Sequence, residues 1–384
     1  MTKDLCILGS TGSIGRQALD VVDQCGLHVT ALTACKNVDI IEGQIRKYRP
    51  AYAAMSDEAA AAELKARVAG MGTQVFSGHE GVCECARASG ADTVLNAIVG
   101  IAGLESTLAA VQAGKNIALA NKETLVAGGS LVTRAVREKG VALLPVDSEH
   151  SAIFQSLQGS PGKQAVHKLI LTASGGPFFG KTRAELENVT AEQALNHPNW
   201  SMGPKITVDS ASMMNKGLEL IEAVWLFDMR PDDVEIVIHR ESIVHSLVEY
   251  VDHSVIAQLG LPDMRIPIQY ALTYPERFES PVGRLSLSQV GKLTFYEPDY
   301  ETFPLMNVCR SAIKRGGLYP AYANSANEEA NILFRQGKIR FMQISELVTD
   351  AVDRAPKCAD YTLEDVLNAD VHARAMVRES VQAE

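Results

Sequence analysis

The first 147 residues alternate short apolar, β-branched runs with alanine-rich stretches, and this alternation limits the folds open to the chain. Stretches such as Asp57–Ala69 and Gly103–Ala113 have the composition of helices. Seven apolar runs between such stretches have the length of buried strands: Leu5–Leu8, Val29–Thr33, Ala51–Met55, Thr73–Phe76, Thr93–Ala97, Asn116–Ala120 and Val141–Val146. Strands that alternate with crossover helices form a mostly parallel, doubly wound sheet. We therefore predict a Rossmann-like α/β domain over residues 1–147.

The pattern changes after residue 147, and a chain of 384 residues is too long for one hydrophobic core. Residues 148–281 mix helices and strands, which predicts a central α+β domain whose sheet is antiparallel in part. Its strands are expected at Leu169–Thr172, Val234–Ile238, Ile243–Tyr250 and Val255–Leu259. Residues 282–302 are turn-rich and predict a linker. Residues 303–384 have a helical period and predict a C-terminal helical bundle.

Composition excludes several classes of function. The net charge of −10 argues against a general binder of nucleic acid or of anionic membranes, although a local basic pocket for a phosphorylated small molecule remains compatible with it. The longest apolar run, around Leu95–Leu104, is too short to span a bilayer. The seven cysteines are scattered, and the N-terminus enters a strand without the features of a signal or transit peptide. These features predict reduced thiols and a cytoplasmic protein.

A glycine-rich loop, Gly9-Ser10-Thr11-Gly12-Ser13-Ile14-Gly15, follows the first predicted strand and opens a helix. Small residues there let a dinucleotide pyrophosphate approach the helix N-terminus, whereas the simpler alternative is a tight strand-to-helix turn. The second strand ends at Ala34-Cys35-Lys36-Asn37. An NAD enzyme usually carries an acid at this point, so Lys36 favours the 2′-phosphate of NADP.

Two further segments combine carboxylates with small polar groups. In a helix from about Met213, Asn215, Lys216 and Glu219 share one face. In an extended backbone, Asp147 and Glu149 point the same way. Hard oxygen ligands suit Mg²⁺ or Mn²⁺, and the serine, asparagine and lysine groups suit a phosphate.

Each of these segments also has a structural alternative. Asp147 or Ser148 could cap a helix that begins at His150, and Lys216 and Glu219 could form a surface ion pair. The combination of both segments with a nucleotide loop favours an active site.

Three other motifs are candidates for a substrate site. Lys122 ends the sixth strand, at the sheet edge where ligands bind, and the alternative is a polar helix start. The turn Ser174-Gly-Gly-Pro177 could form an anion nest or a plain turn. The loop His197–Gly203 carries Trp200, which is either part of a substrate lid or a buried anchor.

Seven motifs in order make the chain similar to the 1-deoxy-D-xylulose 5-phosphate reductoisomerase family: LGSTGSIG, LANKE, PVDSEHSAIFQ, TASGGPF, HPNWSMG, VDSASMMNKGLELIEA and LGLPDMRIPI. The resemblance implies an NADPH-dependent rearrangement and reduction of 1-deoxy-D-xylulose 5-phosphate to 2-C-methyl-D-erythritol 4-phosphate in the non-mevalonate isoprenoid pathway. It also implies a homodimer and a divalent cation, Mg²⁺ or Mn²⁺, with Co²⁺ as a further candidate.

The same resemblance assigns roles to matching residues. The implied metal ligands are Asp147, Glu149 and Glu219. The implied phosphate site is Ser174, Ser210, Asn215 and Lys216, with His197, Ser148 and Lys122 beside the carbon chain. Of these, Lys122, His197 and the three metal ligands are the implied catalytic residues. The implied NADPH contacts are Thr11, Gly12, Ser13, Ile14, Cys35, Lys36, Asn37, Asn121, Glu123 and Gly203, and Trp200 with Met202 forms the implied flap. Cys35 stands where the family often has glycine.

Two other functions would explain part of the sequence. An NADP-linked semialdehyde or homoserine dehydrogenase explains the glycine loop and Lys122, but not two acidic segments with a phosphate site. A non-catalytic NADP-sensing scaffold leaves the clustered acids without a purpose.

Overall fold

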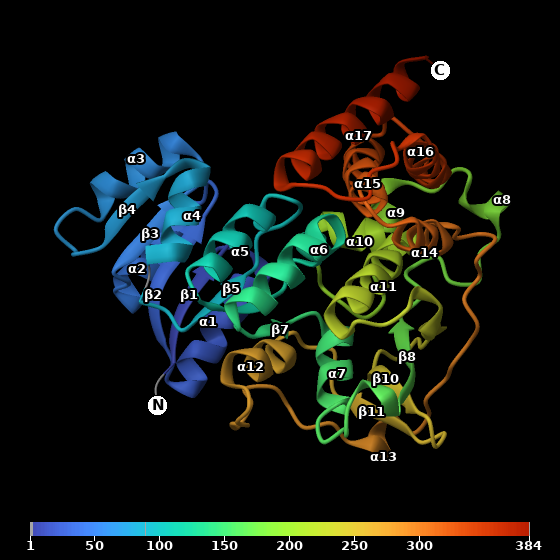
Figure 1. Ribbon diagram of the computed structural model, residues 1–384, viewed down its shortest axis with the longest axis horizontal. Helices are drawn as coiled ribbons and strands as arrows, with labels where there is room; N and C mark the ends of the chain where they lie inside the picture. Colours follow the sequence, from blue (N-terminus) through green and yellow to red (C-terminus); the bar gives the residue numbers. More distant parts are fainter. Residues whose placement is uncertain (1–2, 89, 384) are drawn as a thin grey trace. The chain divides into compact units, whose positions relative to one another are not determined.

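The computed structural model describes residues 3–88 and 90–383 (Figure 1). The chain forms two compact units. The first comprises residues 1–124, 132–151 and 263–283, and the second comprises residues 125–131, 152–262 and 284–384.

A seven-stranded sheet forms the centre of the first unit. Its order is β4-β3-β2-β1-β5-β6-β7, and every neighbouring pair is parallel. Its strands are β1 (Asp4–Leu8), β2 (His28–Ala34), β3 (Tyr52–Met55), β4 (Gln74–Ser77), β5 (Thr93–Asn96), β6 (Asn116–Leu119) and β7 (Leu143–Pro145). The Rossmann-like prediction is confirmed. Because the strand order reverses beside β1, the crevice at its carboxyl end is where such sheets bind ligands.

Helices connect these strands. They are α1 (Ser13–Cys25), α2 (Val38–Tyr48), α3 (Glu58–Arg67), α4 (Gly78–Ala88), α5 (Gly103–Gln112) and α6 (Lys122–Lys139), and α7 (Ser148–Ser156) follows β7. A later helix, α12 (Arg265–Thr273), also belongs to this unit and packs on α1. The sequence predicts residues 263–281 as part of the central domain, whereas the contacts between residues group α12 with the first unit. The division into three domains stays a prediction.

The second unit contains a mixed four-stranded sheet of order β11-β10-β8-β9. Its strands are β8 (Val166–Ala173), β9 (Val234–Ile238), β10 (Val244–Tyr250) and β11 (Val255–Leu259). β10 is antiparallel to β8 and β11, whereas β8 and β9 are parallel, which confirms the expected mixed sheet. Helices α8 (Arg183–Leu186), α9 (Ala191–Ala194), α10 (Pro204–Ala211) and α11 (Met214–Phe227) lie between β8 and β9 in the chain.

The C-terminal part is helical, as predicted. After the short α13 (Leu287–Val290) come α14 (Leu305–Arg315), α15 (Tyr319–Arg335), α16 (Phe341–Arg354) and α17 (Leu363–Ala383). Figure 1 shows these last four helices together in orange and red, and α15 packs on both α16 and α17. Within the described part of the chain, no helix combines the length and the apolar character needed to cross a membrane.

Candidate active site

The glycine loop after β1 leaves the N-terminus of α1 accessible. Gly15 must be glycine, because a Cβ there would lie 2.3 Å from the Gly9 carbonyl oxygen. Gly12 is the N-cap of α1, has no side-chain cap and is exposed, as is Ser13. Backbone N–H groups at such a helix end, with the positive end of the helix dipole, favour an anion. Thr11 and Ile14, which flank these two residues, are half-buried.

The end of β2 carries the residues expected beside the adenosine phosphate. The Lys36 side chain is 77% exposed, and its ammonium lies 3.6 Å from an Asp57 carboxylate oxygen. Cys35 is an exposed free thiol. Asn37 caps α2 by accepting the Ile40 N–H at 3.0 Å. Lys36 is therefore accessible to a ligand phosphate, whereas the Asn37 side chain already has a structural role.

Asn121 shapes the crevice beyond β6. Its amide nitrogen donates to the carbonyls of Ile98 and Gly100, and its side-chain oxygen accepts the Thr124 N–H at 2.7 Å. The side chain thus ties the loop after β5 to the start of α6. A cofactor contact by Asn121 would therefore use its backbone. Glu123 follows in the first turn of α6 and is buried.

Asp147 lies between two basic groups of its own unit. Lys122 Nζ is 2.6 Å from one Asp147 oxygen, and His150 Nδ1 is 3.5 Å from the other. Burial alone would raise the pKa of Asp147, but Lys122 and then His150 outweigh burial and hold that pKa well below its usual range. The carboxylate stays ionised in a buried position, as a cation ligand must.

The expectation of an extended backbone at residues 147–149 is wrong. Helix α7 begins at Ser148, so Glu149 lies in its first turn. The Glu149 N–H donates to Asp147 Oδ1 at 3.4 Å, so Asp147 acts as a cap, the alternative considered above. The Ser148 hydroxyl donates to a Glu149 carboxylate oxygen at 2.6 Å. This capping geometry leaves a hard-oxygen cluster at the helix start.

The second acidic segment folds as the sequence predicted. Met213 has a φ of 60°, which ends α10 and lets α11 begin at Met214. The Asn215 amide donates to one Glu219 oxygen at 2.6 Å, and the Lys216 ammonium contacts the other. The alternative of a surface ion pair is wrong, because Lys216 and Glu219 are only 3% and 1% exposed.

The three expected metal ligands are divided between the units. Asp147 and Glu149 belong to the first unit, and Glu219 belongs to the second. Within the second unit, Glu222 lies three residues after Glu219 on α11 and is fully buried. Glu222 is therefore a competing candidate for a metal ligand on the same helix.

The Ser174 turn after β8 joins several expected site residues. Gly175 and Gly176 have φ values of 76° and 65°. A Cβ at Gly176 would lie 2.6 Å from the Ser210 carbonyl oxygen, so the turn packs directly on the end of α10. Ser174 Oγ lies 2.9 Å from His197 Nε2. The second unit thus brings Ser174, His197 and the Ser210 backbone together.

The protonation of His197 follows from its partners. Its Nδ1 accepts the N–H groups of Asn199 and Trp200 at 3.2 and 3.0 Å, so the ring proton lies on Nε2 and is donated to Ser174. Burial, and then the charge of Arg240, lower the pKa of His197 to about 4. His197 is therefore a neutral donor at physiological pH.

The loop His197–Gly203 has the exposure of a cover and not of a core segment. Trp200 and Met202 are half-buried, and Gly203 is exposed at the N-cap of α10. The Trp200 ring centroid lies 6.1 Å from that of His245. The alternative of a fully buried anchor tryptophan does not fit this exposure.

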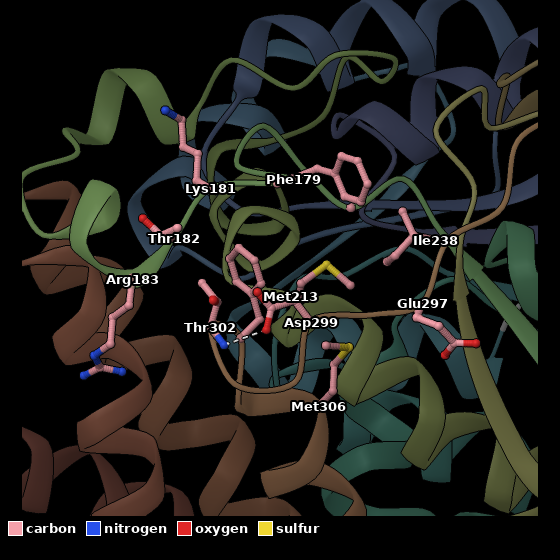
Figure 2. Close-up of a pocket in the computed structure, with 13 residues that line it drawn as sticks. Phe179, Lys181, Thr182, Arg183, Met213, Ile238, Glu297, Asp299, Thr302 and Met306 are labelled. Carbon is pink, nitrogen blue, oxygen red and sulfur yellow. Dashed lines mark hydrogen bonds between the residues drawn. The ribbon is translucent and has the colours of Figure 1, made fainter.

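A cavity of about 230 Å³ has Gly175 of the Ser174 turn in its wall. Figure 2 shows the side chains of Phe179, Met213, Ile238 and Met306 around it, while the charged end of Lys181 points away. This lining suits apolar atoms. It does not provide the inward-pointing donors that a phosphate requires.

Three residues with clear roles in the second unit were missed by the sequence reasoning as site residues. Arg240 donates to the carbonyls of Ser174 and Gly176, and the Asn199 amide donates to the Arg240 carbonyl. Asp209 is buried on α10 and accepts from two asparagines of α15. For Arg240, the only signal in the sequence was its position in a polar turn shortly after a predicted strand.

Comparison with known families settles what kind of protein this is. The model described as 1-deoxy-D-xylulose 5-phosphate reductoisomerase matches residues 5–129. Two C-terminal domain models of the same enzyme match residues 143–227 and 259–376. The chain belongs to the 1-deoxy-D-xylulose 5-phosphate reductoisomerase family.

Relatives and structures of this family match over the whole length. The reductoisomerase of Gloeobacter violaceus is 51% identical over 380 residues, which is 98% of this chain and 97% of the relative. That of Acetivibrio thermocellus is 50% identical, with complete coverage of both chains. The Zymomonas mobilis reductoisomerase in complex with NADPH is 41% identical with a TM-score of 0.94, covering all of both chains. A reductoisomerase in complex with NADPH, fosmidomycin and magnesium is 42% identical with a TM-score of 0.94, covering 99% of this chain and 98% of that one.

Proposed function

We propose that the protein uses NADPH to rearrange and reduce 1-deoxy-D-xylulose 5-phosphate to 2-C-methyl-D-erythritol 4-phosphate. The observation that carries this proposal is the full-length match to family members, including structures that contain NADPH, fosmidomycin and magnesium. A semialdehyde or homoserine-type dehydrogenase is not favoured, because the reductoisomerase models match all three parts of the chain.

The donor chemistry of Asp147, Glu149 and Glu219 fits Mg²⁺ or Mn²⁺. All three offer hard carboxylate oxygens, and Asp147 and Glu219 are buried beside Lys122 and Lys216 respectively. A bound divalent cation would polarise the substrate carbonyl and stabilise the negative charge that forms during rearrangement. Lys122, beside Asp147, can in addition donate a hydrogen bond to a substrate oxygen.

The first unit supplies the residues proposed for NADPH, except for Gly203 of the second unit, and the bound cofactor would supply the hydride. The accessible N-terminus of α1 at Gly12 and Ser13 fits the pyrophosphate. Exposed Lys36 fits the 2′-phosphate, because a phosphate can compete with its 3.6 Å contact to Asp57. Both groups lie where strands β1 and β2 end, at the carboxyl edge of the sheet.

The second unit supplies the residues proposed for the substrate phosphate: Ser174, Ser210, Asn215 and Lys216. Ser174 and the Ser210 backbone lie on packed segments, and Asn215 and Lys216 lie in the first turn of α11, which begins at Met214. His197 is held as a neutral donor against Ser174. Binding energy from this phosphate, remote from the reacting carbons, can orient the substrate.

The loop His197–Gly203 is proposed to close over the substrate. Trp200 and Met202 provide apolar cover, and their partial exposure leaves room for a ligand to bury them further. A closed loop would exclude water while carbon–carbon bonds break and re-form.

The test is NADPH oxidation by the purified protein with 1-deoxy-D-xylulose 5-phosphate, with and without Mg²⁺. We expect oxidation only with the metal, and 2-C-methyl-D-erythritol 4-phosphate as the product by mass spectrometry. Unphosphorylated 1-deoxy-D-xylulose is the matched control and should react far more slowly. Turnover of aspartate semialdehyde instead of the phosphorylated sugar would support the dehydrogenase.

A homodimer is also proposed, supported by the edge of the second sheet. β11 is an edge strand, and Val255, Ile256 and Leu259 on it are exposed. Apolar edge strands invite pairing with a second copy across a two-fold axis. Light scattering should give a mass close to twice the 41.4 kDa of the chain, and Ile256→Lys should lower it.

A cytoplasmic location is proposed as well. All seven cysteines are free thiols, which is usual in a reducing compartment. Fractionation of the source cells with an antibody against the protein would test this.

A further inference from the structure

Arg240 lies in the connection between β9 and β10 and contacts two segments that carry proposed substrate residues. Its Nη1 donates to the carbonyl oxygens of Ser174 and, at 2.8 Å, of Gly176. Its own carbonyl accepts the Asn199 side-chain amide at 2.5 Å. One residue therefore holds the Ser174 turn with its side chain and the His197–Gly203 loop with its backbone.

The turn needs such a donor. Gly175 and Gly176 both have left-handed φ values, and the carbonyls of Ser174 and Gly176 face the same side, where one guanidinium nitrogen reaches both. Carbonyl groups that are partly removed from water require a donor, and a charged donor gives the stronger bond. The guanidinium is further placed by the Phe179 ring, whose centroid lies 5.0 Å from Cζ.

The hydrogen-bond inventory of Ser174 shows why the shape of the turn matters. Ser174 Oγ accepts from His197 Nε2 at 2.9 Å and from the Gly176 N–H at 3.2 Å. A serine hydroxyl has two acceptor lone pairs and one donor proton. Because both lone pairs are used, the hydroxyl proton is the part of Ser174 available to a ligand, and an acceptor such as a phosphate oxygen is the ligand that it fits.

We propose that Arg240 is a positioning residue for substrate binding: by holding the turn and the loop together, it keeps His197 and Gly176 on the lone pairs of Ser174 and directs the hydroxyl proton to the substrate phosphate. The proposal rests on the phosphate role of Ser174 in the proposed function. Arg240 itself touches neither the substrate nor the reacting atoms.

The pKa of His197 is consistent with this placement. Burial lowers it most, and Arg240 is the charged group that lowers it further, to about 4. Removal of the guanidinium charge should therefore raise the pKa of His197 towards its ordinary value, while the backbone contact of residue 240 with Asn199 is retained.

Arg240→Met is the test variant, and Arg310→Met is its matched control. Arg310 also donates to two backbone carbonyls, those of Pro231 and Val234, but holds a different turn of the same unit. We expect Arg240→Met to raise the KM for 1-deoxy-D-xylulose 5-phosphate by roughly tenfold to a hundredfold, as the loss of charge-assisted contacts implies. The KM for NADPH should not change, and Arg310→Met should change neither constant. Arg240→Lys, which keeps the charge, should recover part of the loss.

Proton NMR of the substrate-free protein gives a second measurement that needs no turnover. The His197 signal, assigned by its loss in His197→Gln, should titrate near pH 4 in the wild type and at clearly higher pH in Arg240→Met. A shifted titration in a protein that does not turn over the sugar phosphate would sustain the placement of His197 by Arg240 and refute the proposed reaction. An unchanged substrate KM with an unchanged titration would overturn the proposal. Equal rises of both KM values would also overturn it, since that pattern indicates a general structural defect. If Arg240→Met does not fold, Arg240→Lys takes its place, with a smaller rise in substrate KM expected.

Discussion

Asp209 is a buried carboxylate that connects two helices distant in sequence. It lies on α10, is 1% exposed and accepts from the side-chain amides of Asn327 and Asn331 on α15, at 2.8 and 2.9 Å. Its other oxygen lies 2.9 Å from Lys205 Nζ, an ion-pair contact without hydrogen-bond geometry. Because Ser210 follows directly, this connection also supports the proposed phosphate site.

We predict that Asp209→Leu lowers the free energy of unfolding of the second unit by about 3–5 kcal/mol. Two hydrogen bonds to a charged acceptor contribute about 1.5–3 kcal/mol each, and burial of the leucine side chain offsets about 1.5–3 kcal/mol of that loss. The variant also leaves the two asparagine amides and Lys205 without this acceptor. Their lost interaction raises the total loss of stability to the range expected when one partner of a buried pair is removed. Asp209→Asn keeps an acceptor oxygen without the charge and should cost roughly half as much.

The assay is urea denaturation followed by tryptophan fluorescence. Both tryptophans of the chain, Trp200 and Trp225, lie in the second unit, so their emission reports the unfolding of that unit. The control is Asp350→Leu, which removes a carboxylate from another helical pair, with Arg354 at 2.9 Å, where both side chains are about half exposed. Exposed pairs of this kind contribute about 0.5 kcal/mol or less. A loss below about 1 kcal/mol in Asp209→Leu would refute the argument that this buried cluster fastens α10 to α15.

Three further predictions concern the proposed ligands. Lys36→Ala should raise the KM for NADPH roughly tenfold and leave that for NADH nearly unchanged, and steady-state kinetics with equal effects on both cofactors would contradict the assignment. Glu219→Gln should abolish most turnover and weaken Mn²⁺ binding at least roughly tenfold by calorimetry, because a carboxylate ligand is lost; a larger loss of affinity in Glu222→Gln would move the assignment three residues along α11. Trp200→Ala should lower kcat/KM but cost less than about 1 kcal/mol of stability in urea, since a buried core tryptophan would cost about 3–5 kcal/mol.

Much of the fold follows from local pattern. The central strands β1 and β2 are largely apolar runs buried on both faces, and the alternation of strands with helices specifies a parallel sheet. The shared face of Asn215, Lys216 and Glu219 follows from helical geometry alone once α11 begins before them. Features of this kind depend on residues close in sequence, which is why the sequence predicts them.

The errors arise where local chemistry has two outcomes or where the partner is distant. The segment Asp147-Ser148-Glu149 is compatible with an extended acidic pair or with a helix start. In the structure it is a helix start, with Asp147 as the cap. The burial of Lys216 and Glu219 depends on residues that are distant in sequence, which a local pattern cannot identify. Asp209 was visible in the motif, but its asparagine partners lie more than a hundred residues later, on a helix of different composition.

At the Ser174 turn, the hydrogen bonds that the backbone requires help to predict which distant residue contacts it. Two successive glycines after a strand predict left-handed backbone, and left-handed backbone turns carbonyl groups away from the β-ladder. Those carbonyls then require a donor from elsewhere. The sequence contains 36 lysines and arginines, so it establishes the need for a donor without identifying it. Identification requires the sheet register: β8 and β9 are paired in parallel, with Ala173 opposite Ile238. Their ends therefore coincide, so Ser174, the first residue after β8, lies close to Arg240, the second residue after β9. A predicted strand order would therefore be enough to identify Arg240 as a candidate donor, because it lies two residues after the strand that pairs in parallel with the strand before the glycine turn.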